Sequence, residues 1–172
     1  MKSIAGAKIS SITAGNIDNS NTRIISGSVL TGTNVGNDGF LGFHDSTVVA
    51  IKEGNETEMF GWMTPGTHKF SNSRTFLSFV MPGKSCDLNT NLHGENRSFV
   101  MSLEYEKVFP MDIYPVQLIK ECLAYDLEKM EAMGIYEIAP EDLALCEFVC
   151  TSKTEVQDII RTTLDKALID LA

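Results

Sequence analysis

The pattern of apolar and polar residues changes once along the chain, near Pro110. Before that point, short runs rich in β-branched and aromatic residues alternate with polar turn clusters, which is typical of β-strands. The expected strands are 22–30, 46–52, 57–62, one or two within 67–80, and 98–103. Between them, the polar stretch 81–97 is rich in Gly and Asn and predicts a long loop.

Beyond Pro110 the apolar residues recur with the period of about 3.6 that marks a helix. Pro115 fits the first turn of the first helix, and a short second helix from about Leu127 ends at Gly134, a natural C-terminal cap. A third helix is expected to begin at Pro140.

The last predicted helix follows Ser152-Lys-Thr-Glu155, which has the pattern of a capping box. Its apolar positions form one stripe: Val156, Ile159, Ile160, Leu164, Ala167, Leu168 and Leu171. A stripe of this kind is expected to bury against neighbouring structure. The two patterns together predict an α+β protein, with a β-rich part over 1–109 and a small helical domain over 110–172.

Composition narrows the class of protein. The chain has 172 residues, of which 43% are hydrophobic and 22% charged, as in soluble globular proteins. No apolar run approaches the length of a membrane span and no signal pattern is present, so we expect neither. The net charge of -9 argues against binding to nucleic acid or directly to acidic lipid. Residues 1–110 carry 9 Lys/Arg and 10 Asp/Glu, whereas residues 111–172 carry 5 and 13.

Four cysteines, at positions 86, 122, 146 and 150, are expected to be reduced thiols, because no secretory signal precedes them. Cys146 and Cys150 are four residues apart and so share one face of the predicted helix. A zinc or iron–sulfur site needs about four ligands, and only Cys122 offers a third. Packing as small buried hydrophobes is favoured. The alternative is metal or thiol–disulfide chemistry at Cys122, Cys146 and Cys150.

No catalytic constellation stands out. The sequence has no nucleophile elbow, dinucleotide-binding fingerprint or phosphate-binding loop, so no catalytic, cofactor-binding or metal-ligating residue is assigned. The densest candidate surface combines aromatic and basic residues: Phe60, Trp62, Lys69, Phe70 and Arg74. If exposed, this set suits a partner protein or a flat conjugated ligand. The alternative is a strand-packed aromatic core with a surface ion pair.

Several segments, taken in order, resemble the A subunit of the bacterial sodium-translocating NADH:quinone oxidoreductases. They are Arg23-Ile-Ile-Ser-Gly-Ser-Val-Leu30, Glu58-Met-Phe-Gly-Trp62 with Pro65, Lys69-Phe-Ser-Asn-Ser-Arg-Thr75, Tyr105-Glu-Lys-Val-Phe-Pro-Met-Asp-Ile-Tyr-Pro115 and Glu141-Asp-Leu-Ala-Leu-Cys-Glu-Phe-Val-Cys150. Each is modest alone, but the ordered set is specific. The family's A chain is much longer and these segments match its C-terminal part, so we expect a fragment or a separate domain. The chain departs from the family after Cys150, where Thr151-Ser152 replaces Pro-Gly.

The resemblance implies a peripheral component on the cytoplasmic side of the bacterial inner membrane. The complex passes electrons from NADH to quinone (ubiquinone) and exports sodium. Flavins and the iron–sulfur cluster belong to other subunits, so the resemblance implies no cofactor in this chain, other subunits as partners, and quinone as a further candidate. It also implies a soluble-ligand-binding β-grasp fold, in whole or in part, within 1–109.

These implications predict a non-catalytic portion of the complex that works in subunit docking and in quinone access. The alternative function is a free-standing β-grasp module that binds a small ligand and has no redox role.

Overall fold

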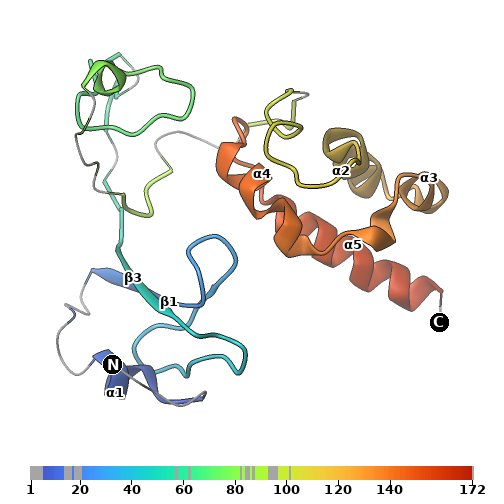
Figure 1. Ribbon diagram of the computed structural model, residues 1–172, viewed down its shortest axis with the longest axis horizontal. Helices are drawn as coiled ribbons and strands as arrows, with labels where there is room; N and C mark the ends of the chain where they lie inside the picture. Colours follow the sequence, from blue (N-terminus) through green and yellow to red (C-terminus); the bar gives the residue numbers. More distant parts are fainter. Residues whose placement is uncertain are drawn as a thin grey trace. The chain divides into compact units, whose positions relative to one another are not determined.

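A computed structural model describes residues 6–13, 17, 21–56, 58–61, 63–81, 83, 86, 88–92, 97–100 and 102–171. The chain divides into two compact units, residues 1–94 (the sheet unit) and residues 95–172 (the helical unit) (Figure 1). The described strands and helices make the protein a mixed α+β protein, as predicted.

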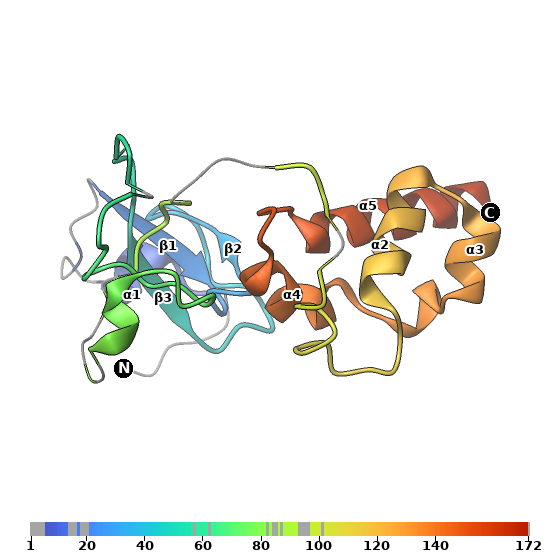
Figure 2. The same ribbon diagram turned by 90° about the horizontal axis from the view of Figure 1, so that it is seen from above.

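The sheet unit is built on three antiparallel strands in the order β2-β1-β3 (Figure 2). The central strand β1 (Thr22–Ser26) pairs with β2 (Thr33–Asn34) on one side and β3 (Val48–Lys52) on the other, with Ile24 opposite Ala50. The predicted strands at 22–30 and 46–52 are confirmed, although both are shorter. β1 ends before Gly27, whose φ of 96° lies in the left-handed region that glycine adopts readily.

A small apolar core supports this sheet. Ile9 of the short helix α1 (Ile9–Thr13) is buried together with Ile24 and Leu41. At the end of β3, the carboxylate of Glu53 accepts hydrogen bonds from Arg23 Nε at 3.0 Å and from Thr90 Oγ1 at 3.1 Å. The Arg23 guanidinium holds the pKa of Glu53 below its usual value.

The other predicted strands are wrong where the structure describes them. Residues 58–61 form a turn in place of the strand predicted over 57–62. The stretch 67–80 holds turns and the 3-10 helix η1 (Leu77–Val80), and residues 98–100 and 102–103 form no strand. Alternating apolar residues indicate a strand only where a partner strand is present, and these stretches pair with no described strand.

The helical unit follows the predicted element order closely. Its elements are α2 (Pro115–Ala124), α3 (Leu127–Ala132), η2 (Ile135–Glu137), η3 (Pro140–Leu143), α4 (Ala144–Val149) and α5 (Val156–Asp170). Pro115 starts α2, and Gly134 follows α3 with a φ of 86°. The α3 N-terminus is capped by the Asp126 carboxylate, which accepts from the Lys129 amide at 3.3 Å.

One apolar core joins these helices. Ile119, Met130, Leu143 and Ile160 are fully buried in it. Tyr105 and Phe109, which the sequence pattern groups with the β-rich part, pack in the same core. The domain division at 109/110 stays a prediction.

Two helix predictions near the cysteines need correction. The single helix expected from Pro140 is instead a 3-10 turn, η3, followed by the α-helix α4. Because α4 ends at Val149, Cys150 lies just past the helix, with a ψ of 115°. Ser152 does not cap α5, which starts at Val156 without a side-chain cap. The Ser152 hydroxyl instead donates to the Ser98 carbonyl at 3.0 Å, and its own carbonyl accepts from the Arg97 amide.

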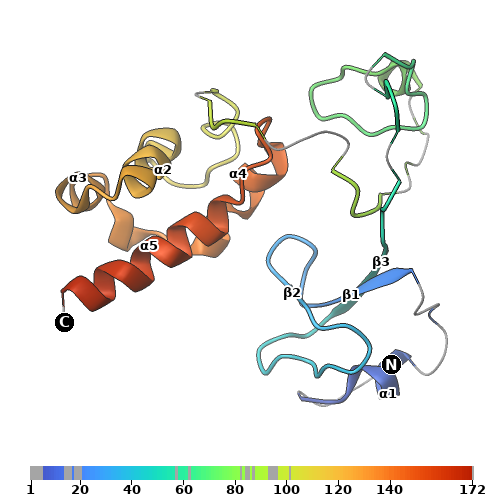
Figure 3. The same ribbon diagram turned by 180° about the vertical axis from the view of Figure 1, so that it is seen from behind.

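The predicted stripe on α5 is buried over most of its length but not at its end. Val156, Ile160 and Ala167 are buried, whereas Leu168 and Leu171 are 72% and 61% exposed. The last turns of α5 lead to the C-terminus at the edge of the helical unit (Figure 3).

Among the described residues, no helix has both the length and the apolar character needed to cross a membrane.

Candidate interaction surface

Residues 58–61 and 63–81 form a lobe of turns around η1, named here the 58–81 lobe and drawn in green in Figure 1. Hydrogen bonds between distant parts of this segment hold the lobe closed. The Leu77 amide donates to the Pro65 carbonyl at 3.0 Å, and the Ser78 hydroxyl donates to the Lys69 carbonyl at 2.6 Å. Trp62, one of the predicted surface residues, lies outside the described residues.

Lys69 lies at the centre of the lobe and is only 6% exposed. Its ammonium group forms an ion pair with Glu58, donates to the Gly61 carbonyl at 2.9 Å, and lies 5.6 Å from the centre of the Phe76 ring. A buried lysine needs such partners, because an unpaired buried charge is costly. Of the predicted surface residues, Lys69 therefore acts inside the lobe and offers little surface to a partner.

Gly66 lets the lobe close beneath an aromatic ring. It has a φ of 58°, and a Cβ built on it would lie 2.4 Å from Cδ1 of Phe76. Real Cβ atoms do not approach a ring carbon so closely. Only glycine fits here, both for its backbone conformation and for its lack of a side chain.

The outside of the lobe exposes several large apolar side chains. Its exposed large hydrophobic residues are Met59, Phe60, Met63, Phe70, Leu77, Phe79, Val80 and Met81. Arg74 is exposed among them, and its guanidinium carbon lies 4.6 Å from the centre of the Phe79 ring. Exposed apolar side chains that gather into one patch mark interaction sites, so these residues are the candidates for a contact surface.

Phe60 and Arg74 thus lie on the surface, as the exposed-cluster hypothesis requires, and both have a φ of 57°. Their role in binding a partner or ligand stays a prediction. Sequence reasoning missed the exposure of Met59, Leu77 and Phe79 because it assigned these residues to strands. The run Phe79-Val-Met81, which does not alternate with polar residues, was the available signal.

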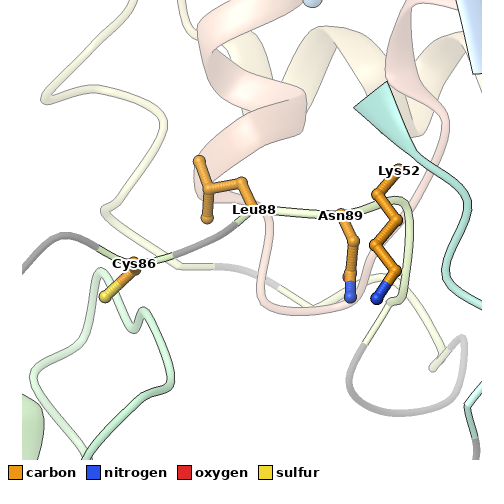
Figure 4. Close-up of a pocket in the computed structure, with 4 residues that line it drawn as sticks. All are labelled: Lys52, Cys86, Leu88 and Asn89. Carbon is orange, nitrogen blue, oxygen red and sulfur yellow. The ribbon is translucent and has the colours of Figure 1, made fainter. Parts of the chain in front are cut away.

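A second feature of the sheet unit is a pocket of about 370 Å³ lined by Lys52, Cys86, Leu88 and Asn89 (Figure 4). The side chains of Lys52 and Asn89 extend in the same direction, and the Thr90 amide ties this segment to β3 by donating to the Lys52 carbonyl at 3.2 Å. The described lining residues offer an amine and an amide, and none of these four residues has the carboxylate or imidazole most often used in acid–base chemistry.

The three cysteines of the helical unit are buried, as the packing hypothesis requires. Burial raises the pKa of Cys122 to about 11 and that of Cys146 to about 11, and Glu106 adds to the effect at Cys146. The Cys150 sulfur accepts from the Thr154 amide at 3.4 Å. Across the described parts of the chain, no three His, Cys, Asp or Glu residues are grouped so as to hold a metal ion.

We expect these thiols to react slowly in the native protein. At pH 8, the half-buried Cys86 should react first with a thiol reagent such as 5,5′-dithiobis(2-nitrobenzoate). Cys122 and Cys146 should react about a hundredfold more slowly, because they are protonated and need an opening that costs about 3 kcal/mol. A Cys86→Ser variant should keep only the slow phase. Equal, fast reaction of all four thiols without denaturant would contradict their burial.

The sequence of the chain is similar to that of known proteins. The family model described as "NQRA C-terminal domain" matches residues 1–37. The A subunit of the Na(+)-translocating NADH-quinone reductase of Serratia proteamaculans is 42% identical over 162 residues, which is 94% of this chain and 36% of that protein. The chain is a relative of these A subunits. The predicted resemblance is confirmed.

Other A subunits give the same result. That of Vibrio alginolyticus is 39% identical over 96% of this chain and 37% of its own length, and that of Yersinia pestis is 42% identical over 92% and 36%. The chain therefore spans about a third of the length of the curated relatives it matches.

Proposed function

We propose that this chain is a non-catalytic part of the A subunit of a sodium-translocating NADH-quinone reductase, and that it works by docking to other subunits of the complex. The observation that carries the proposal is its similarity to A subunits over more than nine-tenths of its length. The name of these relatives describes a reductase that couples NADH, quinone and sodium translocation.

The 58–81 lobe supports a docking role. Its exposed side chains include three aromatic residues, three methionines and Arg74, which are residue types that protein interfaces concentrate at their centres. Lys69 and Gly66 stabilise the lobe from inside, so the outer residues are presented on a folded surface. A prebuilt surface binds at a lower entropic cost than one that must order on binding.

The finer parts of the proposal follow the family resemblance. The sheet unit would carry all or part of a β-grasp fold, and the chain would lie on the cytoplasmic side of the membrane. Flavins and the iron–sulfur cluster would be held by partner subunits. Quinone access would involve the aromatic and basic face around Phe60 and Arg74, both of which are exposed.

Substitution in the lobe tests the proposal. Phe79 is 56% exposed, so Phe79→Asp should leave folding intact while it weakens association with the other reductase subunits by about tenfold or more. The measurement is the fraction of chain retained with the complex, purified from membranes by a tag on another subunit.

The matched control is Phe43→Asp, because Phe43 is 82% exposed but lies outside the lobe. Retention should stay at the wild-type level in this control. If Phe79→Asp is also retained fully, the lobe is not the docking surface. If the chain alone binds a quinone saturably and never associates with the complex, the small-ligand module is the correct function.

A further inference from the structure

One edge of α5 is polar along its first half and apolar along its second half. Gln157 and Arg161 lie on this edge, where Gln157 Nε2 donates to Glu147 of α4 at 2.6 Å and Arg161 donates to Glu141 of η3 at 2.9 Å. Leu164, Leu168 and Leu171 continue the same edge, since residues three and four apart on a helix share a face. Leu168 and Leu171 are 72% and 61% exposed.

An acidic strip runs beside this edge. Asp158 and Asp165 are seven residues apart on α5, so they lie on one face of the helix, and both are exposed. Neither makes an ion pair with any described residue. These aspartates beside the exposed leucines give the second half of the edge an apolar centre with carboxylates along one side.

The net charge of the whole helical unit also favours a positively charged partner. The helical unit carries 7 Lys/Arg and 16 Asp/Glu, whereas the sheet unit carries 7 of each, so the net charge of -9 lies entirely in the helical unit. Two copies of such a unit repel each other, and acidic lipid repels it too. A positively charged protein segment is attracted to it, and complementary charge favours both encounter and specificity.

We infer that the second half of the α5 edge is a docking site for a basic amphipathic segment of another subunit. The leucines contact the apolar side of that segment, and its Lys or Arg residues meet Asp158 and Asp165. This inference rests on the proposed function and assigns a second contact surface, separate in sequence from the 58–81 lobe. A docking site here explains why the apolar stripe of α5 continues past Ala167, although the core of the helical unit does not bury Leu168 or Leu171.

The test is made on the assembled complex. Leu168→Asp and Asp165→Lys should each lower retention of the chain in the purified complex by about tenfold. The matched controls, Leu103→Asp and Asp112→Lys, change exposed residues of the same unit that are not part of α5, and they should be retained like the wild type. A photocrosslinker at position 168 should link to a peptide of another subunit that contains several Lys or Arg residues.

Other outcomes separate this inference from the proposed function. Full retention of both α5 variants, with loss for Phe79→Asp, overturns the α5 site and leaves the docking role intact. No association even for the wild type overturns the proposed function itself. A crosslink from position 168 to a second copy of this chain, or to lipid, overturns the basic segment as the occupant.

Discussion

Ile160→Ala is expected to destabilise the helical unit by about 3 kcal/mol or more. Ile160 is fully buried on α5 within the core that also contains Ile119 and Leu143. Truncation removes transfer free energy and leaves a cavity, and the two effects together typically cost about 2–5 kcal/mol. Urea unfolding followed by far-UV circular dichroism measures the change, because nearly all the described helix is in this unit.

The same helix supplies a matched control. Leu168→Ala removes a similar side chain from a position that is 72% exposed, so stability should change by no more than about 0.5 kcal/mol. Equal losses for the two variants would show that α5 buries a different face from the one described. This control also separates folding from docking, since Leu168 lies in the proposed docking edge.

Gly66→Ala is expected to open the 58–81 lobe. The new Cβ would meet the Phe76 ring at 2.4 Å, and the backbone would have to hold a φ of 58° with a side chain attached. The left-handed conformation alone costs about 1–2 kcal/mol, and the clash adds to it by moving Phe76 away from Lys69. Limited proteolysis should cut between residues 58 and 81 faster in this variant than in the wild type.

Gly36→Ala separates the cost of the left-handed backbone from the cost of the steric clash. Gly36 also has a positive φ, of 62°, but a Cβ there would meet nothing within 4 Å. Its effect should be limited to the backbone cost and should leave the lobe as resistant to protease as in the wild type. If both variants behave alike, steric contact with Phe76 does not hold the lobe closed.

The sequence predicted the helical unit well because its signals are local. Pro115 and Gly134 mark helix ends through their own backbone preferences, and the 3.6-residue period needs no distant partner. The capping box predicted at Ser152 was wrong because the hydrogen bond of this serine depends on a distant residue. A serine can cap a helix or bond elsewhere, and here the Ser98 carbonyl, 54 positions away, takes its hydrogen bond.

The lobe could not be derived from the sequence in this way. Its strands were predicted from alternation, but pairing depends on residues far away in the chain. The burial of Lys69 depends on Glu58, Gly61 and Phe76 meeting around it. The net charge and the family resemblance could be read from the sequence alone. The net charge is a count of charged residues, and the resemblance rests on short segments that occur in the family's order.

The most direct test of the account is the composition of the purified complex. The chain should be affinity-purified from membranes under mild conditions, and quantitative mass spectrometry should measure the molar ratio of each co-purifying protein. We expect other subunits of the sodium-translocating NADH-quinone reductase to co-purify in near-equal amounts, and the chain to show no flavin absorbance once it is separated from them. A chain that purifies alone, carries its own chromophore and oxidises NADH would contradict it.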